Sequence, residues 1–363
     1  MRIAGDLGWT LCLDELGRAD PGEVFIAAVI AFESGQPART ARMLETSCES
    51  PALGRAVASA LGWLPWQTVR PHIDLLARAT PVLGRRAAAA ACAVQRQNFS
   101  SLFDRLLHDD PVVRARVLRA AGELGRHDLH DPLKAALGDS DESCRFWAAF
   151  SLTLFRDPIA HHALCATVDA GGALAERAAI LAARAMPVSD ALAWQRRLAS
   201  TNGSRRFAIQ AAGAIGDPVS VPWLLDQMSN PPMARVAGEA FTTITGIDLA
   251  YHDLDGEWPA GFEVGPNDDP SDANVAMDPD EALPFPDARL VSDWWARNGA
   301  SLRSGARHLA GKPISVSALQ WVLRTGRQRV RAAAALELAL LQPSQPLFEV
   351  RAPAARQREA LGL

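Results

Sequence analysis

The chain has 363 residues and a formal net charge of −4, with 37 lysines and arginines against 41 aspartates and glutamates. Its hydrophobic fraction of 48% is ordinary for a folded protein. The longest apolar run, residues 24–32, is shorter than the roughly 20 residues of a membrane span, and it lacks the basic flank of a signal peptide. We therefore expect a cytoplasmic protein without a membrane partner.

The strongest pattern in the chain is an arginine followed by an alanine-rich apolar run. It returns about once every 30 residues, a period typical of helical repeat solenoids. The arginines that open these runs are Arg55, Arg86, Arg114, Arg145, Arg177, Arg206 and Arg235. Repeat arrays of this kind present extended surfaces that usually bind other molecules.

The predicted elements are short helices in pairs, beginning with residues 24–32 and 38–46. In a later unit, Asp110 and Pro111 supply a cap and a first-turn proline, apolar residues follow at helical spacing, and Gly125 stops the helix. Because one hairpin cannot bury its apolar face alone, neighbouring hairpins must stack. The predicted fold class is all-α, an α-solenoid of stacked helical hairpins with an irregular acidic insert.

The repeat pattern stops near residue 246, where an acidic segment begins. Residues 248–288 contain twelve aspartates and glutamates and no lysine or arginine. This composition is typical of a disordered linker, but apolar side chains such as Trp258 and Phe285 favour an ordered loop packed along the solenoid. We expect a solenoid over 1–246, an acidic Pro-rich insert over 247–288, and C-terminal helices with a capping tail over 289–363.

The recurring arginines have two possible roles, and the residues leave both open. In the structural role, which we favour, each arginine pairs with an aspartate in the preceding turn, as Asp139 or Asp141 would with Arg145, and all seven form a ladder. In the functional role, they line a basic groove for phosphate or an acidic partner. A further group would share one helix face and hold the acidic segment against the array: Arg324, Arg327 and Arg331.

The sequence has no catalytic motif with the right spacing, such as GxSxG, a Walker loop, GxGxxG or HExxH. His161 and His162 with Cys165 resemble a metal cluster, but adjacent histidines point to different sides of a helix. The acidic segment lacks the D-x-D-x-D-G spacing typical of calcium loops. The five scattered cysteines are expected to be buried free thiols. We expect no enzyme, no cofactor and no metal.

Two sets of residues carry a resemblance to known proteins. Two strings of the chain resemble short HEAT repeats of the kind found in phycobilin-lyase-like proteins. They are VRARVLRAAGELGRHDLHDPLKAALGDSDESCR and SRRFAIQAAGAIGDPVSVPWLLDQM. That resemblance covers about residues 50–245 and implies HEAT-like architecture rather than an activity. A bacterial family of HEAT-repeat proteins encoded in type VI secretion gene clusters is similar to later strings, chiefly AGEAFTTITGIDL, DPDEALPFP, VSDWWARN and LRTGRQRVRAAAALELALL.

The second resemblance implies a non-catalytic protein-binding scaffold of a type VI secretion system. The specific expectation is an immunity protein that binds and neutralises a cognate toxin effector, such as a nuclease. One alternative is an adaptor or chaperone that loads the effector, and another is a nucleic-acid-binding HEAT-like solenoid, against which the single tyrosine argues. The candidate partner-binding residues are Asp268, Asp269, Asp272, Asp278, Asp280, Glu281, Trp294, Trp295, Arg324, Arg327 and Arg331.

Overall fold

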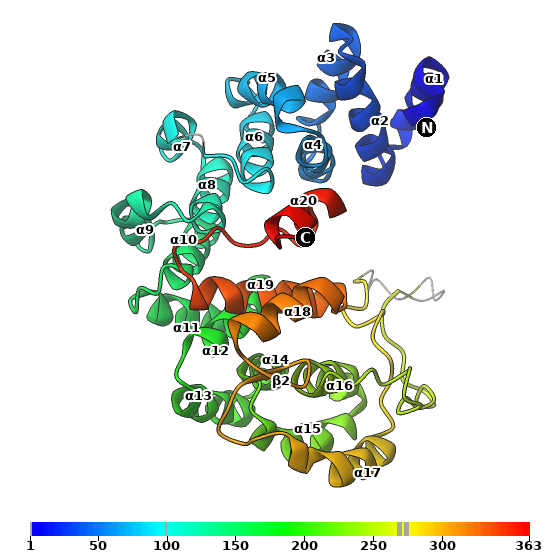
Figure 1. The fold of residues 1–363 in the computed structure, drawn as a ribbon, viewed down its shortest axis with the longest axis vertical. Helices are drawn as coiled ribbons and strands as arrows, with labels where there is room; N and C mark the ends of the chain where they lie inside the picture. The colour runs from blue at the N-terminus through cyan, green and yellow to red at the C-terminus, as the bar shows by residue number, and fades with distance from the viewer. Residues whose placement is uncertain (1, 99, 267–270, 272–275) are drawn as a thin grey trace. The chain divides into compact units, whose positions relative to one another are not determined.

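The computed structural model describes residues 2–98, 100–266, 271 and 276–363. The chain forms two compact units. Unit 1 consists of Met1–Ala163 with Ala339–Leu363, and unit 2 consists of Leu164–Leu338. The described residues are mostly helical, and they include a single sheet of two short strands (Figure 1). The prediction of an all-α solenoid of helical hairpins is confirmed.

Unit 1 is a succession of short helices. These are α1 (Gly5–Glu15), α2 (Pro21–Ser34), α3 (Pro37–Thr46), α4 (Pro51–Trp63), α5 (Trp66–Ala77), α6 (Val82–Val94), α7 (Ser100–Leu106), α8 (Pro111–Leu124), α9 (His130–Ala136), α10 (Glu142–Leu154) and α20 (Ala354–Ala360). Alternate helices pack against one another in a row from α2 through α4, α6 and α8 to α10 (Figure 1). We call this row the inner helices of unit 1.

Unit 2 continues the same pattern. Its helices are α12 (Ala175–Ala185), α13 (Val188–Ser200), α14 (Arg205–Ile215), α15 (Val221–Met228), α16 (Pro231–Thr245), α17 (Ala288–Asn298) and α18 (Val316–Thr325). Here α12, α14 and α16 form the inner row. The boundaries between the units fall within α11 (Ala160–Ala170) and α19 (Gln328–Leu341). The strands β1 (His308–Leu309) and β2 (Lys312–Pro313) pair antiparallel.

Local sequence signals explain where the inner helices begin and end. Asp110 accepts a hydrogen bond from the Val112 amide at 2.9 Å, and Pro111 occupies the first turn, where its missing N–H leaves no bond unmade. The helix ends at Gly125, whose φ of +67° places it in the left-handed region that favours glycine. The predicted start and end signals of this helix, a capping aspartate with a first-turn proline and a terminal glycine, are therefore confirmed in α8.

Small residues let the inner helices approach closely. A methyl group at Gly213 would lie 2.9 Å from the Cα of Ala240 in the next inner helix. At the equivalent contact in unit 1, the Ser151 hydroxyl accepts the Gly122 amide at 2.9 Å and donates to the Leu118 carbonyl at 2.6 Å. The alanine-rich runs are thus the close-packed interior layer, because larger side chains would push the helices apart.

The segment between α16 and α17 folds without an α-helix in its described residues, yet it is packed. Leu249 and Leu254 are buried in the core of unit 2. The Gly256 amide donates to the Phe285 carbonyl at 2.8 Å, and the Asp287 amide donates to the Leu254 carbonyl at 2.9 Å. These contacts tie the two ends of the segment together. The division of the chain at residues 246 and 288 stays a prediction.

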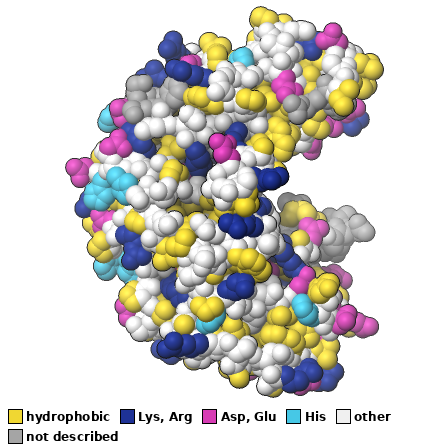
Figure 2. All heavy atoms as spheres, viewed as in Figure 1, with side chains coloured by type: hydrophobic (Ala, Val, Ile, Leu, Met, Phe, Trp, Pro, Cys, Tyr) yellow, Lys and Arg dark blue, Asp and Glu magenta, His cyan; other side chains and the backbone are white. Residues whose placement is uncertain are grey.

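Charged side chains of both signs are mixed on the surface. On the face shown in Figure 2, basic and acidic side chains of the described residues lie interspersed with apolar ones. Proteins that bind the phosphate backbone of a nucleic acid usually have basic residues clustered on one face. The viewed face does not have this character.

Candidate binding surfaces

Arginines in the first turns of the inner helices form hydrogen bonds with the loops that connect one hairpin to the next. Arg114 donates from Nε and Nη2 to the Asp139 carboxylate at 2.7 and 3.0 Å, and from Nη1 to the Asp109 carbonyl at 2.8 Å. Arg85 binds the Asp109 carboxylate in the same way, at 2.6 and 2.9 Å. The hydrogen bonds from these arginines hold the pKa of both carboxylates below the usual range. We call this set of pairs the ladder.

The ladder differs from the predicted one in register and in direction. Arg85 rather than Arg86 makes the pair in α6, because each residue advances about 100° around a helix and the neighbouring side chain leaves the row. The aspartate lies in the turn that leads to the next inner helix, not in the preceding turn. The preceding turn supplies carbonyl oxygens instead, as Arg145 shows by donating to Asp139 and Ser140 at 2.8 and 2.9 Å.

The row differs from the prediction at two further inner helices. Arg55 is an exposed side chain of α4. In α12 the first-turn residue that joins the row is Glu176, the neighbour of Arg177, and it accepts a hydrogen bond from Arg206 at 2.6 Å. In unit 2 the row therefore includes an acidic residue, which pairs with the arginine of the next inner helix.

The last two rungs of the ladder anchor the acidic segment. Arg206 binds the Asp280 carboxylate through Nη1 and Nη2 at 2.8 and 2.7 Å, and Arg235 binds Asp278 at 2.6 and 3.0 Å. The Trp258 ring covers the Arg235 guanidinium, with 4.8 Å between the guanidinium carbon and the ring centroid. The hydrogen bonds from Arg235 hold the pKa of Asp278 below the usual range. Asp280 is buried and Asp278 is partly buried, and both bind arginines of the same chain. A contact of these aspartates with a partner stays a prediction.

The predicted aromatic pair also packs internally. Trp294 and Trp295 in α17 lie edge-on to Phe241 of α16, with ring centroids 5.7 and 6.2 Å apart. Both are partly buried against the core of unit 2. In the described structure these side chains dock α17 on the core of unit 2, and their contact with a partner stays a prediction.

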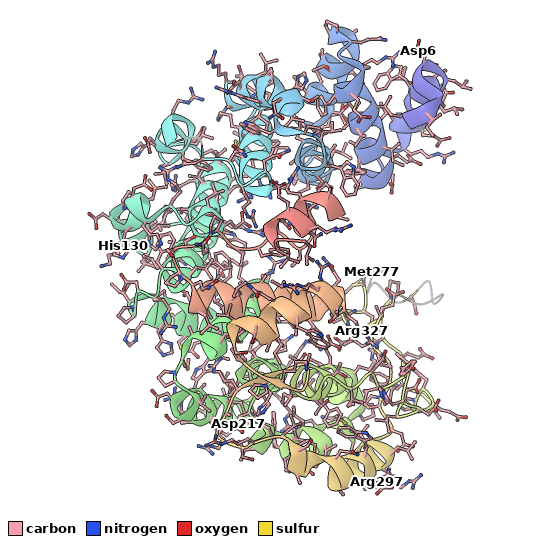
Figure 3. The ribbon with its side chains drawn as sticks, in the orientation of Figure 1. Asp6, His130, Asp217, Met277, Arg297 and Arg327 are labelled. Carbon is pink, nitrogen blue, oxygen red and sulfur yellow. The ribbon has the colours of Figure 1, made fainter. Side chains whose placement is uncertain are left out.

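The three predicted arginines of the C-terminal part do not share one helix. Arg324 is exposed near the end of α18, and Arg331 lies in α19. Arg327 lies in the junction between these two helices (Figure 3). Arg327 forms an ion pair with Asp248, so it does bind the start of the acidic segment. Arg331 donates to the Leu323 carbonyl at 2.8 Å and so joins the two helices.

The remaining predicted acidic residues divide into two groups. Glu281 is exposed and follows directly on the anchor at Asp280. The others, Asp268, Asp269 and Asp272, lie outside the residues that the structure describes.

The anchored segment exposes large apolar side chains together with carboxylates. Tyr251 is 80% exposed, Met277 68% and Trp258 49%, and Val264 is exposed as well. The exposed carboxylates of the same segment are Asp253, Asp255, Glu257, Glu263 and Glu281. Aromatic residues and methionine are enriched in protein–protein interfaces relative to the rest of a surface. We call these side chains the insert surface. Sequence reasoning named its acidic character but missed Tyr251, Trp258 and Met277 as candidates.

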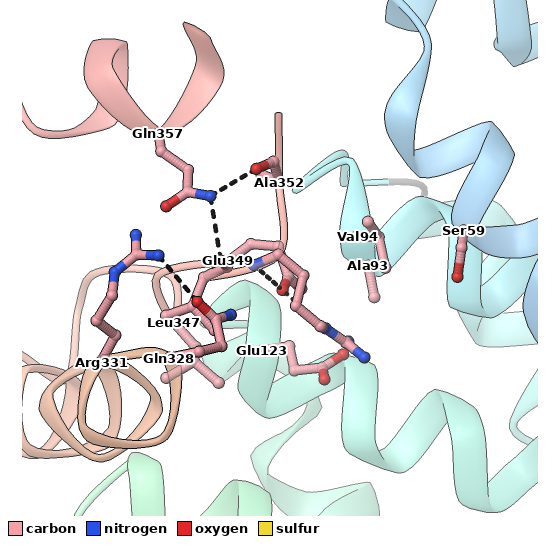
Figure 4. Close-up of polar contacts among 12 residues, drawn as sticks. Ser59, Ala93, Val94, Glu123, Gln328, Arg331, Leu347, Glu349, Ala352 and Gln357 are labelled. Atoms are coloured by element: carbon pink, nitrogen blue, oxygen red, sulfur yellow. Dashed lines mark hydrogen bonds and ion pairs between the residues drawn. The ribbon is translucent and has the colours of Figure 1, made fainter. Parts of the chain in front are cut away.

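In unit 1 the C-terminal tail covers the ends of the inner helices. Arg96, directly after α6, donates to the Leu347 carbonyl at 2.7 Å and lies 3.5 Å from the Glu349 carboxylate. The Leu347 amide donates to the Glu123 carbonyl at 3.0 Å. The Gln357 amide donates to carbonyl oxygens within the tail, which fixes the bend before α20 (Figure 4). The tail thus satisfies helix-end carbonyls, as a capping segment should.

Unit 2 has an equivalent covering, made by the loop that contains β1 and β2. Arg307 donates to the carbonyls of Ala183 and Met186 at the end of α12, at 2.7 and 2.8 Å. Three backbone amides cover the ends of α14 and α16: His308 to Gly216, Ala310 to Thr243, and Gly311 to Ile244. The helix ends are therefore occupied by the chain itself in both units, and we do not treat them as partner surfaces.

The described part of the chain has little that could react with a substrate or hold a metal ion. It contains no group of three or more histidine, cysteine, aspartate or glutamate side chains placed to hold a metal ion. The five cysteines are free, and burial raises the pKa of Cys92 to about 12. No described helix combines the length and the apolar character that crossing a bilayer requires.

The comparisons with known proteins support the repeat architecture. Residues 99–184, which run from α7 to α12, match the family model of HEAT repeats. Neither the curated proteins nor the solved structures gave a match to the chain. HEAT repeats commonly form scaffolds that bind other proteins, and the stacked hairpins of this chain have that architecture.

Proposed function

We propose that this protein is an immunity protein of a bacterial type VI secretion system, which binds and neutralises a cognate toxin effector. The resemblance of the acidic segment and of the helix after Arg327 to a family encoded in such gene clusters supports the context. The repeat architecture supports a scaffold that acts by binding rather than by catalysis.

The insert surface is the observation that carries this proposal. Its exposed Tyr251, Trp258 and Met277 lie on a segment that two partly buried aspartate–arginine pairs hold in place. A binding surface that is ordered before the partner arrives loses less conformational entropy on binding. Central aromatic side chains with surrounding polar groups are the usual composition of an energetically important interface.

The charge of the insert surface indicates the kind of toxin. A nuclease holds phosphates in a basic groove, and a carboxylate-rich segment can occupy such a groove by complementary charge. The exposed carboxylates of the segment have no lysine or arginine among their sequence neighbours from 248 to 288. A basic toxin is therefore the partner that this surface fits best.

Co-expression in bacterial cells with the toxin encoded beside its gene tests the proposal. The unaltered protein should restore growth, and Tyr251→Ala combined with Glu257→Lys and Glu263→Lys should abolish protection and weaken toxin binding at least about tenfold. Asp226 is an exposed carboxylate on α15, so Asp226→Lys is the matched control and should keep full protection. Binding without protection would favour an effector adaptor, and neither binding nor protection would overturn the proposal.

A further inference from the structure

A second set of arginines lies in unit 1, on a face of the inner helices that the ladder does not use. Arg55 and Arg86 occupy the same position, the fifth residue, in the successive inner helices α4 and α6. Arg116 and Arg119 follow on α8, within electrostatic range of Arg86. We call these four residues the inner basic face.

The inner helix α8 supplies a carboxylate to this face. Glu123 accepts hydrogen bonds from Arg116 Nη2 at 2.9 Å and from Arg119 Nε at 2.8 Å. Burial alone would raise the pKa of Glu123, but the charges of Arg116, Arg119 and Arg96 hold it at about 2. One carboxylate is therefore shared among several guanidinium groups, and the face keeps an excess of positive charge.

Arg55 and Arg86 carry that excess. Within the residues that the structure describes, neither guanidinium group has an ion pair or a hydrogen bond. Arg86 is half-buried; burial lowers its pKa, and the neighbouring charges of Arg55 and Arg119 lower it further. On the same face, Arg116 is buried and its Nη1 has no acceptor in the described structure. Unpaired, partly desolvated charges of one sign destabilise a fold, so they mark candidate functional sites.

The face also has room for a ligand. One turn after Arg55 and Arg86 the helices carry Ser59 and Ala90, two small residues that are exposed and half-buried respectively. A long side chain at either position would cover the arginines. Arg55 itself is exposed and Arg86 is half-buried, so solvent reaches both residues.

The C-terminal tail shows how a peptide docks beside this face. Its residues 346–349 lie outside helices and strands, and its backbone at Leu347 exchanges hydrogen bonds with Glu123 and Arg96. Glu349 places its carboxylate 3.5 Å from Arg96. A non-helical segment with a carboxylate is therefore a ligand that the inner helices already accept from the chain itself.

We propose that the inner basic face binds an extended, carboxylate-bearing segment of a partner protein, and that Arg55 and Arg86 bind its carboxylates. Guanidinium groups bind carboxylates bidentately, with shorter and stronger hydrogen bonds than neutral pairs make. This site goes beyond the immunity proposal, because it lies in unit 1 and is made by residues unrelated to the insert surface in unit 2.

A peptide fits the face better than a nucleic acid does. Glu123 and Glu349 lie beside the arginines and interrupt the positive charge of the face. Separate positive sites suit single carboxylates of a peptide better than a continuous phosphate backbone. The neighbouring ring of Trp147 is covered by Arg119, whose guanidinium carbon lies 4.4 Å from the ring centroid, so it does not offer the open stacking platform that single strands use.

Fluorescence anisotropy with the full chain tests the proposal, using a fluorescein-labelled oligoglutamate peptide as the probe. The unaltered protein should bind the probe, and Arg55→Gln with Arg86→Gln should weaken binding at least about tenfold. Arg78 is an exposed arginine at the end of α5, so Arg78→Gln is the matched control and should change binding little. Thermal unfolding should show that all variants fold.

Three results would overturn this proposal. The first is an unaltered protein that does not bind oligoglutamate at low salt. The second is equal loss of binding in the Arg78 control, which would indicate attraction by net charge alone. The third is tighter binding of an oligothymidylate of equal charge that oligoglutamate does not displace, which would assign the face to nucleic acid. Failure of the toxin assay would leave this outcome unaffected, because the insert variants keep Arg55 and Arg86.

Discussion

Arg85 and Arg86 are adjacent in one helix, and their surroundings are opposite. Arg85 forms two hydrogen bonds to Asp109, and these bonds raise its pKa. Arg86 has no carboxylate partner in the described structure, and burial beside Arg55 and Arg119 lowers its pKa. The ladder and the inner basic face therefore place the same residue type, arginine, in different surroundings. In the ladder, the arginine charge is paired and stabilises the stacked helices. In the inner basic face, the arginine charge has no carboxylate partner in the described structure.

The largest expected effect concerns the most deeply buried rung of the ladder. Arg235→Ala should lower the free energy of unfolding by about 3 kcal/mol, because it leaves the Asp278 carboxylate buried without its partner. Urea denaturation measures this loss. The double variant Arg235→Met with Asp278→Leu should recover most of it, since no uncompensated charge remains. A loss below about 1 kcal/mol would mean that the rung behaves like an exposed surface pair.

A smaller effect is expected from the pH dependence of a ladder rung. The pKa of Asp139 is lower in the folded protein than in the unfolded chain, because Arg114 donates two hydrogen bonds to it. Its contribution, about 2 kcal/mol, is fully present above an unfolded pKa of about 3.9 and is lost as the pH falls through the lower folded value. Asp139→Asn should therefore lower stability at neutral pH and flatten the acid limb of the stability curve. An unchanged acid limb would contradict this role.

The smallest expected effect on stability is at Arg86, and it is the sharpest contrast with the ladder. Arg86→Gln should leave the free energy of unfolding unchanged or raise it by less than about 1 kcal/mol, because it removes a charge that its neighbours repel. The melting temperature should therefore stay the same or rise slightly. Arg85→Gln in the same helix should cost about 2 kcal/mol, because charged hydrogen bonds are lost. If the two variants lost stability equally, the distinction between the two sets would fail.

Local features of the sequence predicted the helices well. Asp110 and Pro111 begin α8, and Gly125 ends it, as the pattern indicates, because caps and first-turn prolines act within one turn of the chain. Two helices end without the glycine that this rule would lead one to expect. Arg96 and Arg156 adopt left-handed conformations where glycine is usual. The guanidinium group of Arg96 binds the Leu347 carbonyl in the tail, and that of Arg156 binds the Leu340 carbonyl in α19.

The candidate binding surfaces were predicted only in part. The acidic composition of the insert pointed to it, but its two most specific aspartates proved to be internal anchors, bonded to Arg235 and Arg206 across 43 and 74 residues of sequence. Trp294 and Trp295 looked equally suited to a partner, and they pack on Phe241. Sequence separation of this size leaves no periodic signal that could identify the partners.

The sequence by itself determined that this protein is a stack of α-helical hairpins, because the repeat period, the caps and the small apolar residues all act between near neighbours. Only the tertiary structure decided which arginine pairs with a carboxylate of the described chain and which does not. Ion pairing depends on separations of a few ångströms in space, and one step of rotation around a helix separates Arg85 from Arg86. That step distinguishes a residue that stabilises the stack from one that we propose binds a partner.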